Sequence, residues 1–505
     1  MFKRKDVLIG ILLSALALPA SAAELELLVI DETTDRPTAA RVHLKNAQGR
    51  TPRVADAVSW KDHFVFANKV VLKLPPGRYT FEMERGPEYR RRTGHFELKR
   101  GDADSKTVSM VRFVDMKSEG WYSGETHIHR RPEDISLLML AEDLHVAPVI
   151  TWWNKTNRWK EKPLPKEALV RFDENRYYHL LAGEDERAGG ALLYFNLREP
   201  LEIADAEREY PSPITFLDEA AEHDGVHVDL EKPFWWDTPT QLATGKIDSI
   251  GLAHNHMHRG GVLNNEAWGR PRDDMLYPGT GGNGRWTTDI YYHVLNCGLR
   301  IPPSAGSASG VLPNPVGYNR AYVYCGDDFS YASWWKGLRE GKVVVTNGPL
   351  LRPFCEGHPP GHVFQGEENQ PLSLQISANL ATRDPIEYLE VIRDGKVVHE
   401  VRLDALAKNR GKLPALEFSE SGWFLVRAVT STPHTYRFAS SGPWYVEFGG
   451  QPRISKTSAQ FFLDWVYERA RRLKIEDVDQ HQEVLSHHRA ARDYWKELVE
   501  RANAE

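Results

Sequence analysis

Two pairs of histidines, each separated by one residue, constrain this chain more than any other feature of its sequence. His127 and His129 stand in "GETHIHR", and His254 and His256, followed at the same spacing by His258, stand in "SIGLAHNHMHRGG" at the end of an apolar run. Alternate residues of an extended strand point to the same side, so each pair presents two imidazoles together. Neutral imidazole is the commonest nitrogen ligand of Zn²⁺ and related ions. Two such pairs predict a metal site built from separate strands, and the alternative is a rim of exposed histidines.

Short apolar strands alternate with helical segments between residues 116 and 350. The strands read "APVIT", "HLLAGE", "GVHVDL" and "SIGLAH", and the segments "PEDISLLMLAEDL" and "PITFLDEAAEHD" have helical spacing. This alternation predicts an α/β layer or barrel. Parallel barrel strands bring their carboxyl ends to one face, where we expect the histidine pairs to meet.

The regions on either side of this segment have a different pattern. Residues 23–115 and 351–450 contain short alternating strands and turn signals such as "LPPG" and "RDGK", which predict two β-sandwiches. Residues 451–505 place aliphatic and aromatic side chains three and four apart. This spacing predicts a helical tail, and we expect it to pack on the body of the protein.

The first 22 residues have the features of a secretory signal peptide. A basic start precedes the apolar run "VLIGILLSALAL", and "ASA" ends at Ala22, which is typical of a cleavage site. The alternative is an anchor that stays in the membrane. Cleavage predicts a mature chain that begins near Ala23, works in the periplasm or outside the cell, and does not remain inserted in a membrane.

Composition excludes some function classes. The 64 Lys and Arg against 70 Asp and Glu give a net charge of −6, which argues against nucleic-acid binding because that needs a clustered basic surface. The three cysteines, Cys297, Cys325 and Cys355, are too few and too sparse for a disulfide framework. We expect buried free thiols, with a single bridge as the alternative.

Carboxylates follow several of the predicted strands. "LLAGED" places Glu184 after an apolar strand and a glycine, and "HVDLEKPFWWD" places Glu231 on the same strand face as His227 and Asp229. Glu184 is therefore a candidate ligand. For Glu231 the alternative is an exposed salt bridge with Lys232.

The motif "GETHIHR" is similar to the first motif, Gly-Asp-x-His-x-His, of the PHP superfamily (polymerase and histidinol phosphatase). With "LLAGED", "LNCGLRIPPSAGSASG", "YNRAYVY" and "VVVTNGPLL", residues 116–350 resemble the CehA/McbA-like metallohydrolase branch. The resemblance implies a distorted (β/α)7 barrel, one to three divalent metals, and hydrolysis of an ester, carbamate or phosphoester. The expected fold class is therefore α/β, with this PHP-like barrel flanked by two β-sandwiches and followed by the helical tail.

The chain departs from the family pattern at three places. Residues 151–153 read Thr-Trp-Trp instead of Thr-Asp-His, residues 306–308 read Gly-Ser-Ala instead of Gly-Ser-Asp, and Glu125 replaces the usual Asp. The first two changes remove up to three ligands, so we expect one divalent ion, Zn²⁺ or Mn²⁺, in place of a trinuclear cluster. The expected ligands are His127, His129, Glu184 and one of His254 or His256, with His256 preferred.

A mononuclear site with an open position activates water and polarises a substrate oxygen. For proton transfer we expect Glu231 or His254 as the general base. For the developing negative charge we expect Arg320 or Lys232.

Aromatic side chains suggest the substrate class. Broad indole faces stack on sugar rings or aryl groups, although Trp also fills large cores. The expected substrate-binding residues are Trp152, Trp153, Trp235, Trp236, Trp268, Arg270 and Tyr291. Trp286 is a further candidate, and Glu266, Arg272 and Asp273 add charges that suit an acidic or hydroxylated glycan or form a solvated loop.

Three functions are compatible with these residues. The first is a metal-dependent hydrolase that acts on a small molecule. The second is a carbohydrate-active hydrolase or lyase with the same metal, in which His256, Tyr291, Tyr292 or His293 transfers protons. The third is a glycan binder that has lost catalysis together with its ligands.

Overall fold

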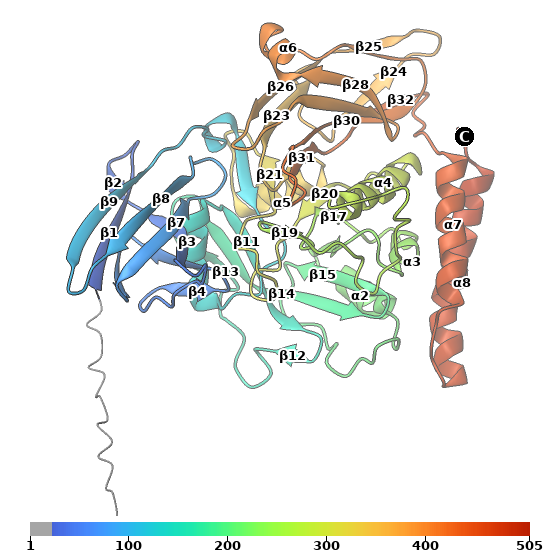
Figure 1. Cartoon of the computed structure of the whole chain (residues 1–505). Coiled ribbons are helices and arrows are strands. Elements are labelled where there is room, and N and C mark those ends of the chain that lie inside the picture. Colours follow the sequence, from blue (N-terminus) through green and yellow to red (C-terminus); the bar gives the residue numbers. More distant parts are fainter. Residues whose placement is uncertain (1–22) are drawn as a thin grey trace, which may run out of the picture.

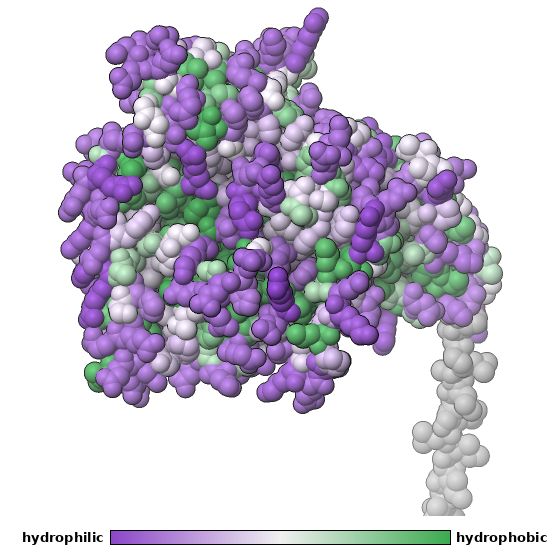
Figure 2. All heavy atoms as spheres, turned by 180° about the vertical axis from the view of Figure 1, so that it is seen from behind, coloured by the Kyte–Doolittle hydropathy of each residue, from purple (hydrophilic) through white to green (hydrophobic). Residues whose placement is uncertain are grey.

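The computed structural model describes residues 23–505 as three connected β-rich regions followed by a helical hairpin (Figure 1). The predicted signal peptide, residues 1–22, lies outside the described residues. Within the described part, no helix combines the length and the apolar character needed to cross a membrane. The face shown in Figure 2 is mainly hydrophilic, with small apolar patches scattered between charged side chains.

Residues 23–110 form two sheets that enclose a core of their own. The first sheet has β1 at its centre, paired with β2 and β6 in antiparallel and with β9 in parallel orientation. Its strands are β1 (Ala23–Asp31), β2 (Arg36–Pro37), β6 (Lys69–Leu74) and β9 (Ala103–Met110). The second sheet runs β4 (Val58–Trp60), β5 (His63–Ala67), β3 (Ala39–Asn46), β7 (Gly77–Glu84) and β8 (Arg92–Leu98). In β6 every second residue is buried, as period-two alternation predicts.

The central region is built on a mixed sheet. Its strands pair in the order β22, β21, β10, β11, β14, β15, β16, β17, β20. Their bounds are β10 (Trp121–Gly124), β11 (Val146–Trp153), β14 (Tyr177–Arg187), β15 (Gly190–Phe195), β16 (His227–Leu230), β17 (Ser249–Ala253), β20 (Pro303–Ala305), β21 (Arg320–Tyr324) and β22 (Val343–Thr346). Pairing is parallel at β10/β11, β11/β14, β16/β17 and β17/β20.

Helices connect only some of these strands. They are α1 (Ile135–Glu142), α2 (Pro213–Ala221), α3 (Thr238–Leu242), α4 (Gly282–Asn296) and α5 (Tyr331–Arg339). The predicted helix at residues 132–144 begins as a 3₁₀ turn at Pro132, becomes α1, and ends at Asp143 in a left-handed conformation. Between β11 and β14 the connection holds only β12 (Thr156–Asn157) and β13 (Leu169–Arg171), and β14 and β15 form a hairpin. The mixed α/β class is therefore as predicted, but the named strands of residues 23–505 form no closed ring.

The C-terminal β-rich region continues this sheet, because β22 pairs with β31. Its strands are β23 (Leu350–Cys355), β24 (Val363–Gly366), β25 (Leu372–Leu374), β26 (Ile376–Ala381), β27 (Tyr388–Arg393), β28 (Lys396–Arg402), β29 (Leu416–Phe418), β30 (Gly422–Val429), β31 (Phe438–Ser441) and β32 (Trp444–Phe448). A short helix, α6 (Leu403–Lys408), follows β28. The predicted "RDGK" turn joins β27 to β28, with Asp394 and Gly395 both at positive φ, as a tight hairpin requires.

The tail is a hairpin of α7 (Lys456–Ala470) and α8 (Val478–Glu500), which packs against α3 and α4 (Figure 1). Phe462 of α7 stacks on Trp495 of α8 with ring centroids 4.7 Å apart. The three cysteines are free thiols, and Cys297 and Cys355 are buried.

The first His-x-His segment lies between two parts of the central sheet. The amide of Ile150 donates to the carbonyl of Ile128 at 2.8 Å, and the amide of His129 donates to the carbonyl of Ser309 at 2.8 Å. The amide of Thr126 donates to the carbonyl of Ala305 at 2.9 Å. Residues 126–129 therefore bridge β11 and the chain that follows β20, which fixes both histidines from two sides.

Gly183 of β14 gives a test of how tightly this region packs. A Cβ at Gly183 would lie 1.8 Å from the Trp152 ring, whereas a Cβ at Gly260 would contact nothing. Gly183→Ala should therefore lower the free energy of unfolding by about 1–3 kcal/mol through overpacking, measured by urea denaturation. Gly260→Ala is the control and should change it by less than about 0.5 kcal/mol. Equal stabilities of the two variants would contradict this packing.

Candidate metal centre

Three buried side chains converge at the carboxyl end of β14. The Nε2 atoms of His127 and His129 are 3.0 Å apart, and the Oε2 atom of Glu184 lies 3.5 Å from the first and 3.0 Å from the second. Each side chain is at most 8% exposed. These are three of the four predicted ligands.

Close backbone packing holds the two histidines in place. Gly306 faces His127 so closely that a Cβ there would lie 2.4 Å from the His127 Cβ. Gly310, at φ +106°, faces the carbonyl of His129, and a Cβ would lie 2.6 Å from that oxygen. The segment that contains Gly306 and Gly310 therefore forms part of the wall behind the histidines.

Glu184 enters the cluster through the register of β14. Glu184 pairs with Trp153 of β11, so its side chain projects from the sheet beside the histidine segment. Burial alone would raise the pKa of Glu184, but His127 and His129 lower it to about 2. Its Oε2 atom is buried and accepts no aligned hydrogen bond from the described residues. An ionised, buried oxygen of this kind needs a positive charge beside it, which a protonated His127 or a bound metal cation would supply.

The residues present fit a divalent metal ion. Ligands about 2.0–2.1 Å from a tetrahedral Zn²⁺ lie about 3.3 Å from one another, and the three edges of this triangle are 3.0, 3.0 and 3.5 Å. Two imidazoles and one carboxylate form a donor set that suits Zn²⁺ or Mn²⁺. With three protein ligands, one position stays open for water or substrate.

Glu231 supports His127 from behind. Its Oε1 lies 3.3 Å from the Nδ1 of His127, and its Oε2 accepts a hydrogen bond from the Trp235 indole at 3.0 Å. The Lys232 ammonium pairs with the same carboxylate. Burial would raise the pKa of Glu231, but Lys232 and His127 hold it well below its usual value. A carboxylate stabilised by three donors is a weak base. The contacts therefore favour a role for Glu231 in orienting His127, with Lys232 as its ion-pair partner.

The second histidine pair lies outside this compact group. The Nε2 atom of His254 forms a hydrogen bond with the hydroxyl of Thr287 at 2.9 Å. Its Nδ1 atom accepts a hydrogen bond from the backbone amide of His256 at 3.3 Å. With both ring nitrogens engaged, His254 is not free to act as a general base. His256 donates through Nδ1 to the carbonyl of Asn265 at 2.9 Å, and it does not join the three converging ligand atoms. Phe234 packs against both rings.

Arg320 and Glu125 also have partners elsewhere. The Arg320 guanidinium donates to the carbonyls of Gly317 and Glu142 at 2.6 and 3.0 Å, so it is not available to neutralise an oxyanion at the cluster. Glu125 accepts a hydrogen bond from the amide of Ser307 at 2.5 Å and another from the amide of Gly317. Glu125 does not belong to the group of converging ligand atoms, which consists of His127, His129 and Glu184.

The predicted aromatic residues divide into two groups. Trp153 and Trp268 line a cavity of about 750 Å³, and the Trp153 ring lies 4.9 Å from that of His129. The other candidates are buried or lie at the tail. The Trp152 ring stacks on Tyr194, and the Trp235 ring stacks on Trp268. The Arg472 guanidinium lies over the ring of Trp236. Arg270 donates a hydrogen bond to the Glu468 carboxylate, and the Tyr291 hydroxyl donates one to the carbonyl of Ile301. Of the remaining proton-transfer candidates, Tyr292 faces Arg427 and His293 faces Ser458.

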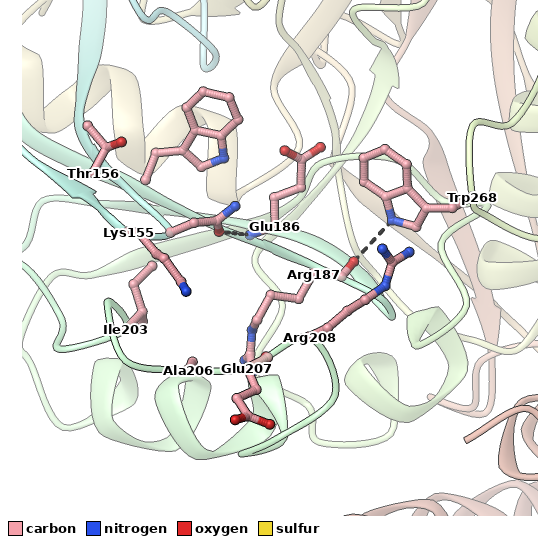
Figure 3. A pocket seen from close by; sticks show the side chains of 11 residues that line it. Lys155, Thr156, Glu186, Arg187, Ile203, Ala206, Glu207, Arg208 and Trp268 are labelled. Atoms are coloured by element: carbon pink, nitrogen blue, oxygen red, sulfur yellow. Dashed lines mark hydrogen bonds between the residues drawn. The ribbon is translucent and has the colours of Figure 1, made fainter. Parts of the chain in front are cut away.

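Glu186 is one of the cavity residues that were not predicted. It lines the cavity with Trp153 and Trp268 (Figure 3), and its amide donates to the side chain of Asn154 at 2.8 Å. Burial and the charge of Glu184 raise the pKa of Glu186 to about 7. Strand alternation from Glu184 could have identified it, since residues two apart share a face.

A second group of potential ligands lies in the N-terminal region. Asp62 is 3.1 Å from the Nδ1 atoms of both His43 and His63. The Nε2 atom of His43, however, faces the Arg41 guanidinium. Arginine only donates, so the proton of His43 lies on Nδ1, directed at Asp62. This arrangement is satisfied by hydrogen bonds and does not require a metal.

Comparisons of the chain with protein-family models, with curated proteins and with solved structures return no match.

Metal binding can be tested by removing single ligands. His129→Ala and Glu184→Gln should each lose the bound divalent metal after dialysis, because two ligands do not hold it, with the fold retained. Elemental analysis measures the metal and circular dichroism the fold. His95→Ala removes an exposed histidine and should retain the metal. Full occupancy in both ligand variants would contradict the site.

The orienting role of Glu231 predicts a graded effect. Glu231→Gln should weaken Zn²⁺ affinity by about 10–100-fold without abolishing binding, measured by competition with a chelator. The double variant Glu231→Gln/Lys232→Met also removes the unpaired ammonium. If affinity returned fully in the double variant, the loss would come from the Lys232 charge and not from the orientation of His127.

Proposed function

We propose that this protein is a metal-dependent hydrolase that cleaves an ester, carbamate or phosphoester bond with metal-activated water. The observation that carries the proposal is the convergence of His127, His129 and Glu184 beside a large open cavity. The predicted signal peptide places this activity in the periplasm or outside the cell.

A PHP-like barrel is part of the same proposal. Ile128 forms parallel bridges with both Val149 and Ser309, so the histidine segment spans the space between β11 and the chain after β20. This supports a strongly distorted barrel in which the first motif contributes the closing segment. The resemblance of "GETHIHR" to the first PHP motif agrees with that position.

A divalent cation bound by these ligands supplies an acidified water and a Lewis acid for the substrate oxygen. The chain's own residues prepare the site for it. Glu231 orients His127 and keeps its Nε2 directed at the cluster. Trp153 covers His129 on the cavity side, and Glu186 shares the face of β14 with Glu184. By its position, Glu186 takes the general-base role that was expected of Glu231.

A carbohydrate-active enzyme is the second candidate, and the exposed indole of Trp268 on the cavity wall favours it. A lyase mechanism has less support than hydrolysis, because Tyr291, Tyr292 and His293 all form hydrogen bonds with partners away from the cavity. A glycan binder without catalysis is the outcome if metal has no effect on any substrate.

The proposal is tested by metal removal and return. Purified protein should hydrolyse at least one member of a panel of aryl esters, aryl carbamates and phosphate esters. Chelation should lower the rate by at least about 100-fold, and Zn²⁺ or Mn²⁺ should restore it. His129→Ala should match the chelated protein, and His95→Ala should match the untreated one. A rate that is unchanged by chelation would contradict the proposal.

A further inference from the structure

Trp268 presents an aromatic face that the fold holds rigid. Its side chain is 41% exposed, yet its indole N–H donates to the carbonyl of Arg187 at 3.0 Å. One ring face stacks on Trp235 with centroids 5.2 Å apart and a 26° interplanar angle. Trp235 is in turn fixed by its hydrogen bond to Glu231. The opposite face of Trp268 is therefore open to the cavity, and its orientation is set before any ligand arrives, which lowers the entropy lost on binding.

Two cations line the same cavity without a carboxylate partner. Arg208 and Lys155 form no ion pair with any side chain of residues 23–505, whereas the neighbouring Arg187 is held by Asp185. Figure 3 shows the Arg208 guanidinium directed toward Trp268, while the carboxylate of Glu207 points away from it. A positive group beside an open aromatic face is suited to a ring that carries an anionic substituent.

The rest of the wall suits a hydroxylated ring. Asn154, Thr156 and Glu186 supply polar groups, and the volume of about 750 Å³ accommodates more than one pyranose ring. Ligand sites typically fall within about 300–1,000 Å³.

We propose that this cavity binds an acidic saccharide. A pyranose ring lies on the free face of Trp268, its carboxylate pairs with Arg208, and Lys155 offers a second cation to a neighbouring unit. The inference rests on the proposed function, because it names the substrate class of the same site. Trp153 lines the same cavity and lies beside His129, with ring centroids 4.9 Å apart, so an ester or other labile group of that sugar can approach the cluster from this side.

The probe is trigalacturonate, compared with its fully methyl-esterified form, which has the same rings without the charges. Calorimetric titration into metal-free protein should show the acid binding about tenfold more tightly than the ester. The advantage should shrink at high salt, because the cations lie at an exposed cavity wall.

Variants assign the two contacts. Arg208→Gln should weaken binding of the acid by about tenfold and so remove its preference over the ester. Arg198→Gln, an exposed arginine outside the cavity, should keep the preference. Trp268→Ala should weaken both ligands by about tenfold through lost stacking, and Trp268→Phe should restore part of the loss. Thermal unfolding of each variant confirms that the fold is retained.

Equal affinity for acid and ester, no binding of either, or an unchanged preference in Arg208→Gln would overturn the inference. Its failure is distinguishable from failure of the hydrolase proposal. Metal-dependent hydrolysis that is indifferent to substrate charge would refute only the acidic saccharide. Tight binding of trigalacturonate without metal-dependent hydrolysis would refute only the hydrolase.

Discussion

The arrangement of this protein depends on buried ionisable side chains that neutralise one another. At the candidate centre, Glu184 and Glu231 are both removed from water, and His127 lies between them. Burial alone would lower the pKa of His127, but the two carboxylates raise it to about 10. Burying any one of these charges without its partner would cost several kcal/mol of folding free energy. Each residue is therefore needed to keep the others in their buried positions.

The same principle joins the N-terminal sheets to the central region. Arg41 of β3 pairs with Glu84 of β7 and with Glu142 at the end of α1, where the Nε–Oε1 distance is 2.5 Å. Arg320 of β21 donates to the backbone of the same Glu142. Arg320 was expected, as an alternative to Lys232, to neutralise the negative charge that develops on the substrate. Its burial in this network instead makes it part of the junction between the two regions.

The cavity follows from how the tryptophans are divided. Trp152 is directed into the core and requires Gly183 opposite it, whereas the next residue, Trp153, faces the cluster and the cavity. Strand alternation accounts for this opposition. Trp235 is buried and stacks on Trp268, so the Trp235 indole supports the ring of Trp268, whose other face is exposed. A row of aromatic residues in the sequence thus becomes one binding surface and one supporting layer.

The sequence by itself predicted the mixed α/β class of the fold and three of the side chains that converge at the candidate centre. The spacing of apolar side chains predicted the order of the regions along the chain: a β region, a mixed α/β region, a second β region and a helical tail. Such spacing can be read from the sequence because it depends only on residues that are close together in the chain. His127 and His129 were predicted from the His-x-His pattern, and Glu184 was predicted because it follows an apolar strand and a glycine. Tertiary structure decided the rest. His254 and His256 have the same local pattern as His127 and His129, but their ring nitrogens do not join the three converging ligand atoms. Both nitrogens of His254 form hydrogen bonds, to Thr287 and to the amide of His256, whereas His256 donates through Nδ1 to the carbonyl of Asn265. Glu231 orients instead of acting as a base because Lys232 and Trp235 share its carboxylate. These outcomes depend on contacts between residues distant in sequence, and spacing along the chain does not encode them.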